Sequence, residues 1–157
     1  MTGEKQTVSY ADRIRHLRER SGRSHADVAA AVGVQLPWYY DVESHDEETT
    51  CGLTLLQLHR LSHSLGITLR QLLATSDDFM AVQPQRLTLD DLAHRLRERV
   101  DALGIGAVED AVGWRLEHFL NDPSIAWEEP VDFLRFSCHF VGVEWMEVVP
   151  LEPSLTA

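Results

Sequence analysis

The polar groups best suited to recognising another molecule lie close together in residues 35–43, QLPWYYDVE. Gln35 carries an amide that both donates and accepts hydrogen bonds, and Tyr40 adds a hydroxyl five residues later. Leu36 and Trp38 supply apolar surface beside them. The segment contains neither Arg nor Lys. Its chemistry is therefore hydrogen bonding and apolar contact rather than charge attraction.

Other reactive residue types do not form a catalytic motif. His59 and His63 stand one helical turn apart and could share a metal ion, but no Glu or Cys follows at ligand spacing, so surface histidines are the favoured interpretation. Cys51 and Cys138 have no catalytic frame, and the chain has no Gly-rich phosphate loop or nucleophile elbow. The sequence predicts a protein that is not an enzyme and that uses no cofactor or metal.

The composition is that of an ordinary water-soluble protein. Of the 157 residues, 44% are hydrophobic, and no run of about 18 apolar residues could cross a membrane. The N-terminus has no apolar stretch of the secretory type, and the two cysteines lie far apart. We expect a cytoplasmic protein without a membrane partner.

The charge is unevenly distributed. The net charge of −11 argues against an indiscriminate nucleic-acid binder. Residues 1–75 hold 8 Lys and Arg against 9 Asp and Glu, whereas residues 76–157 hold 6 against 16. A surface that binds a polyanion is therefore expected in the first half, where residues 13–23, RIRHLRERSGR, contain five arginines. The alternative is that this run is a solvated helix face.

Apolar residues recur at the helical spacing of three and four, and no stretch alternates as a strand would. The pattern predicts five short helices in residues 10–75, with Ser24, Thr54 and Thr68 as N-caps. Their apolar stripes are Tyr10, Ile14 and Leu17; Val28 and Val32; Tyr39 and Val42; Leu55, Leu58, Leu61 and Leu65; and Leu69, Leu72 and Leu73.

A second, weaker copy of the same unit follows. HLRER at 16–20 returns as RLRER at 95–99, AAVG at 30–33 returns as DAVG at 110–113, and Gly66 matches Gly142. The sequence thus predicts an all-α chain of two tandem five-helix units, the second degenerate. The expected boundaries are an N-terminal domain at 1–75, a linker at 76–88, an acidic C-terminal domain at 89–150 and a tail at 151–157. Chance similarity between two small helical domains is the alternative.

Residues 10–75 resemble the lambda-repressor-like family of helix-turn-helix domains, also called XRE-like or Cro-like. The residues that carry the resemblance are Val28 and Ala29, the turn Val32, Gly33 and Val34, then Tyr39, Val42 and Glu43, and the segment 53–73, LTLLQLHRLSHSLGITLRQLL. Gly33 suits the positive φ of a tight turn between helices. The resemblance implies that the second helix crosses a DNA backbone while the third lies in the major groove.

The same resemblance suggests which residues contact double-stranded DNA. They are Arg20, Arg23, Ser24 and His25 around the start of the second helix, and Gln35, Leu36, Trp38 and Tyr40 on the third. Readers in this family are usually more polar, and Asp41 would repel phosphates. The expected function is a DNA-binding transcriptional regulator with an atypical recognition helix. The alternative is a protein-interaction regulator, antirepressor-like or antitoxin-like, that keeps the fold without specific DNA binding.

An aromatic stripe marks the C-terminal domain. Phe133, Phe136 and Phe140 recur at spacing three and four, where the first copy carries polar residues. With Trp145 they form the expected interface of a homodimer, because exposed aromatic patches usually mark interfaces. The alternative is that the rings pack within the monomer, on Trp127 or on the C-terminal tail.

Overall fold

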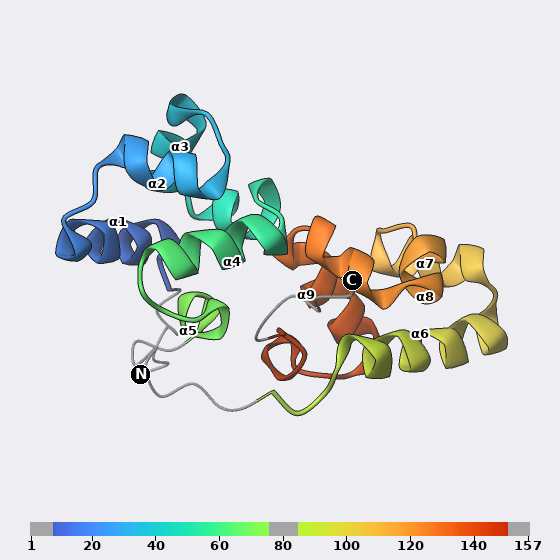
Figure 1. The fold of residues 1–157 in the computed structure, drawn as a ribbon. Helices are drawn as coiled ribbons and strands as arrows, with labels where there is room; N and C mark the ends of the chain where they lie inside the picture. The colour runs from blue at the N-terminus through green and yellow to red at the C-terminus, as the bar shows by residue number, and fades with distance from the viewer. Residues whose placement is uncertain (1–7, 76–84, 151–157) are drawn as a thin grey trace, which may run out of the picture.

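The computed structural model describes residues 8–75 and 85–150 (Figure 1). Across these residues the chain is helical, with nine α-helices, three short helices of other types and no strand, which confirms the all-α prediction. Most of the predicted linker, residues 76–84, and the predicted tail lie outside the described residues.

The first half contains the five α-helices that the sequence predicts: α1 (Tyr10–Ser21), α2 (His25–Val32), α3 (Leu36–Val42), α4 (Leu55–Ser64) and α5 (Leu69–Leu73). A single π-helical turn, η1 (Glu48–Gly52), precedes α4. The hydroxyls of Ser24, Thr54 and Thr68 each accept a hydrogen bond from the backbone N–H three residues later. These caps satisfy N–H groups that would otherwise have no partner in the helix.

The turn between α2 and α3 depends on Gly33. Its φ of 87° is in the left-handed region, and its N–H donates to the Ala29 carbonyl at 2.9 Å. Glycine adopts this conformation without the steric cost of a Cβ. The sharp turn places α3 against the end of α2, as a helix-turn-helix requires.

Within residues 85–150, the second half contains four α-helices and two 3₁₀ helices. Its helices are α6 (Leu89–Leu103), α7 (Ile105–Val112), α8 (Glu117–Asn121), the 3₁₀ helix η2 (Pro123–Glu128), α9 (Val131–Val141) and the 3₁₀ helix η3 (Trp145–Glu147). Left-handed glycines end corresponding helices, Gly113 after α7 and Gly142 after α9. These glycines agree with the predicted second copy, which stays a prediction.

The two halves pack through one continuous apolar core that runs from Ile14 to Val149. Figure 1 shows α4 extending from the first half toward α9. At this junction the Leu55 N–H donates to the Glu129 carbonyl at 2.9 Å, and the His59 ring meets Trp127 edge-on with centroids 5.8 Å apart. The halves are therefore joined by packing as well as by the chain.

The prediction that Phe133 forms part of an exposed aromatic surface on α9 is wrong. This side chain is only 1% exposed and packs edge-on against Phe119, with ring centroids 5.0 Å apart. The reason is that α9 is covered on more than one side, by α6 and α7 and by η1. Phe136 alone of the three phenylalanines is well exposed, at 46%, whereas Phe140 is half-buried against the core.

Candidate nucleic-acid interface

The candidate interface is the outer surface of α3 together with the start of α2. Tyr39 and Val42 are fully buried and fix α3 to the core. The helical period then turns the intervening positions outward, so Trp38 is 37% exposed and Tyr40 is 48% exposed. Two residues thus anchor the helix and their neighbours form its surface.

Gln35 and Tyr40 both offer hydrogen-bonding groups on this surface. Gln35 is the exposed N-cap residue of α3, and its side chain makes no capping hydrogen bond. The Tyr40 ring lies 4.9 Å from the His25 ring, centroid to centroid. Because His25 begins α2, this contact joins the outer surfaces of the two helices.

Trp38 presents mainly an apolar face. Its Nε1–H donates to Glu48 Oε2 at 2.9 Å, and Glu48 lies in the π-helical turn η1. The one polar group of the indole is therefore already engaged within the chain. Sequence reasoning missed this pair, since Glu48 lies ten residues away in a segment without a helical pattern.

Most of the arginine run has a structural role rather than a binding role. Arg13 is buried, and its Nη1 donates to the carbonyls of Leu72 at 2.8 Å and Ala74 at 2.7 Å at the end of α5. Arg15 pairs with Asp12 at 2.8 Å on the surface of α1. The alternative of a solvated face also fails for Arg13, which lies one turn from Tyr10 on the apolar side of α1.

Arg18 forms a buried ion pair with Glu43, directly after α3. Its Nε and Nη2 donate to the two carboxylate oxygens at 2.6 and 3.0 Å, and His25 Nε2 lies 3.5 Å from the same carboxylate. Burial by itself raises the pKa of Glu43, but the hydrogen bonds and charge of Arg18, together with contributions from Tyr39 and His25, outweigh it and leave that pKa below its ordinary value. The pair keeps the carboxylate charged and holds α3 on α1.

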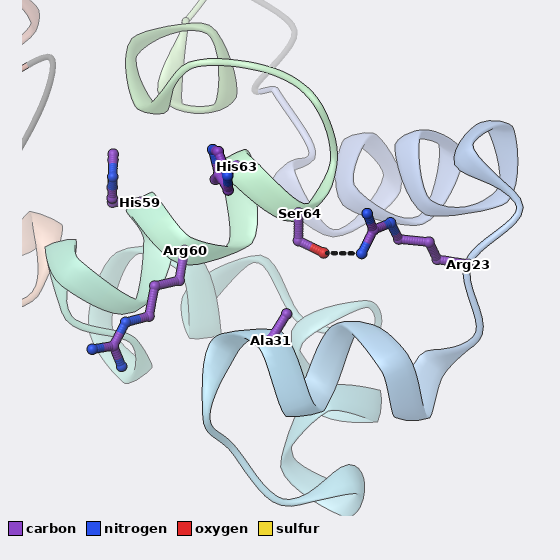
Figure 2. Close-up of a pocket in the computed structure, with 6 residues that line it drawn as sticks. All are labelled: Arg23, Ala31, His59, Arg60, His63 and Ser64. Atoms are coloured by element: carbon purple, nitrogen blue, oxygen red, sulfur yellow. Dashed lines mark hydrogen bonds between the residues drawn. The ribbon is translucent and has the colours of Figure 1, made fainter.

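Arg20 and Arg23 are both exposed, and the Arg23 side chain contacts α4 rather than α3. Figure 2 shows Arg23 reaching toward α4, where its Nη1 donates to Ser64 Oγ at 3.4 Å. Ser24 is occupied as the cap of α2, with its hydroxyl accepting from the Asp27 N–H at 3.1 Å. The structure thus brings the His25 and Tyr40 rings together, exposes Gln35 and Trp38 elsewhere on α3, and directs Arg23 toward α4.

The described residues form neither a metal cluster nor a membrane-spanning helix. Within residues 8–75 and 85–150, no group of three or more His, Cys, Asp or Glu side chains is placed to hold a metal ion. No helix in the described part of the chain combines the length and apolarity needed to cross a membrane. The α2–α3 surface therefore remains the candidate site.

Comparison with known proteins identifies this part of the chain. Residues 9–44 match a family described as a helix-turn-helix domain, and this segment is such a domain, of the lambda-repressor-like type. The match confirms the resemblance for α1, α2 and α3. No curated protein and no solved structure matches the chain.

Proposed function

We propose that this helix-turn-helix protein is a transcriptional regulator of the XRE-like type that binds double-stranded DNA through an atypical recognition helix. The observation that carries the proposal is the domain at residues 9–44. Its α3 is fixed to the core by the buried Tyr39 and Val42 and exposes Trp38 and Tyr40 to solvent. Domains of this kind place the corresponding helix in the major groove. Such a regulator acts on DNA in the cytoplasm and needs no catalytic group.

The base readout we propose favours A·T pairs. The Gln35 amide can bond the N6 and N7 positions of adenine, while the Tyr40 ring and the half-buried Leu36 can contact thymine methyl groups. Because α3 carries no Arg or Lys, the bidentate contact that reads guanine is missing. We infer a modest affinity for an A·T-containing half-site.

Few groups on the protein are placed to contact the phosphates of the DNA backbone. Arg20 and the amides at the start of α2, next to Ser24 and His25, are the groups we propose for the backbone. The exposed Asp41 opposes them. Affinity from one domain should therefore be low and should fall as salt rises.

A homodimer would compensate for the weak half-site. We propose that it forms through the C-terminal half, at a surface around Phe136, with Phe140 and Trp145 at its margin. The Phe136 ring lies 6.2 Å from Trp114, centroid to centroid, so the exposed aromatic surface continues onto the turn after α7. Two linked half-sites bind more tightly than one because the second contact is intramolecular.

The second candidate function is a protein-interaction regulator that keeps the fold without specific DNA binding. The observation in its favour is the character of the α3 surface, where exposed aromatic rings stand beside Asp41 and no cation. Aromatic residues of this kind are enriched at protein interfaces. A protein partner would then cover the same surface that we assign to DNA.

An electrophoretic shift with the duplex that flanks the protein's own gene tests the proposal. The full chain should shift it at low salt, and Gln35→Ala should bind with altered sequence preference. Arg99→Ala, an exposed arginine on α6, serves as the matched control. If wild type and both variants fail to shift any duplex at low salt, the protein-interaction function replaces the proposal.

A further inference from the structure

A hollow of about 360 Å³ lies between α2 and α4 in the first half (Figure 2). The residues that line it are Arg23, Ala31, His59, Arg60, His63 and Ser64. Ala31 contributes little more than its methyl group, so the donors come from α4 and from the segment before α2. We call this hollow the α2–α4 groove.

Positively charged and hydrogen-bond donating groups dominate the α2–α4 groove. Arg23 closes one end, where its Nη1 contacts Ser64 Oγ. Arg60 extends toward the other end of α2, with its Nη1 3.8 Å from the position that a Cβ on Gly33 would take. Figure 2 shows Arg23 pointing toward Ser64 from the segment before α2, and Arg60 extending toward the far end of α2. None of the lining residues is acidic.

The proposed DNA surface does not use this groove. His25, which meets Tyr39 and Tyr40 of α3, and Ala31, which lines the groove, are six residues apart on α2. At about 100° per residue they point about 120° apart around the helix axis. A duplex docked on α3 would therefore leave the α2–α4 groove open.

We propose that the α2–α4 groove binds a small organic phosphate that carries at least two negative charges. Guanidinium groups bind phosphate through paired N–H donors, and the Ser64 hydroxyl and the His63 imidazole offer further donors. A phosphate accepts at three terminal oxygens, which suits donors from several directions better than a flat carboxylate does. The volume falls at the small end of ligand sites, about 300–1,000 Å³.

The test is a titration of the full-length protein with inorganic pyrophosphate at constant ionic strength, followed by the ¹H–¹⁵N signals of the arginine Nε groups. Saturable shifts are expected at Arg23 and Arg60. Arg60→Gln should weaken binding about tenfold, because it removes a charged donor, while Arg60→Lys should retain part of the affinity. Arg99→Gln on α6 is the matched control and should bind as the wild type does. Acetate should produce no saturable shift.

Three results would overturn the proposal. The first is the absence of saturable pyrophosphate binding to the wild type. The second is equal weakening by Arg60→Gln and Arg99→Gln, since that would mean a general charge effect. The third concerns the source of the phosphate. Arg60→Gln should leave affinity for duplex DNA unchanged, so a loss of DNA affinity in this variant would assign the groove to the DNA backbone instead. Circular dichroism of each variant confirms that it is folded.

Discussion

The Arg18 guanidinium and the Glu43 carboxylate form a two-bond ion pair that joins α1 to the end of α3. Both residues are buried, with 8% and 7% of their surface exposed. The geometry matters for the site because Glu43 directly follows the helix that we propose to read DNA. A rigid pair at this point fixes the position of α3 on the core.

Replacing Arg18 with Ala should lower the free energy of unfolding by about 3–5 kcal/mol, because it leaves the Glu43 carboxylate buried without its partner. Urea unfolding followed by circular dichroism measures the change. Arg20→Ala is the matched control, since Arg20 is exposed and its loss should matter by no more than about 0.5 kcal/mol. Equal stability of the two variants would show that the pair does not hold α3.

The Arg18–Glu43 ion pair also makes the free energy of unfolding depend on pH. The pKa of Glu43 is lower in the folded protein than its ordinary value of 4.5, so the contribution of this group is present above about pH 4.5. It is lost as the pH falls through the lower folded-state value. Glu43→Gln should be less stable at neutral pH but should lose less stability on acidification. A variant whose stability falls with pH as steeply as the wild type's would contradict this assignment.

The contacts between the halves predict how a fragment behaves. Residues 1–78 should show a helical circular dichroism spectrum and a cooperative melt, because the five helices carry their own caps and apolar stripes. The melt should come at a lower temperature than that of the full chain, since the fragment lacks Trp127 against His59 and the Val149 carbonyl that Arg70 binds. A disordered spectrum would refute the assignment of an independent N-terminal domain.

Local sequence signals were sufficient for much of the fold. The hydroxyl caps at Ser24, Thr54 and Thr68 and the left-handed glycine at Gly33 are short-range features, and each lies where the pattern predicts it. The same is true of the α3 anchors, because alternation of buried and exposed positions follows from the helical period.

Long-range pairing was not accessible in the same way. In the sequence, Arg13 and Arg18 are two members of a basic run. In the structure, Arg13 binds the Leu72 carbonyl 59 residues away, and Arg18 binds Glu43 25 residues away. Phe133 was predicted to lie on the surface because only one face of its helix was expected to be covered. A signal was present in part, since Arg13 and Arg18 share the apolar side of α1 with Ile14 and Leu17.

Phe136→Glu should convert the proposed dimer into a folded monomer and lower DNA affinity with it. Phe136 is 46% exposed, and burying such a ring stabilises an interface by roughly 1.5–3 kcal/mol. Light scattering at tens of micromolar measures the mass, with Leu103→Glu as the control for an exposed apolar residue outside the proposed surface. A monomeric wild type at this concentration would rule out the dimer.

Thymine methyl groups should contribute to affinity if Tyr40 lies against them. Replacing thymine with uracil in the tightest-binding duplex removes each methyl and should weaken binding about fourfold for every methyl in contact. In Tyr40→Ala the same replacement should have little effect. If uracil weakens binding to the variant and to the wild type equally, Tyr40 is not the residue that contacts the methyl.

The most direct test of the account is a selection of duplexes from a random-sequence pool by the full-length protein at low salt, about 50 mM, where phosphate contacts are least screened. We expect enrichment of an A·T-containing motif, arranged as two half-sites if the dimer binds, and its loss in the double variant Gln35→Ala with Tyr40→Ala. A pool that stays random after repeated rounds with the wild type, or a motif that the double variant also enriches, would contradict DNA reading by α3.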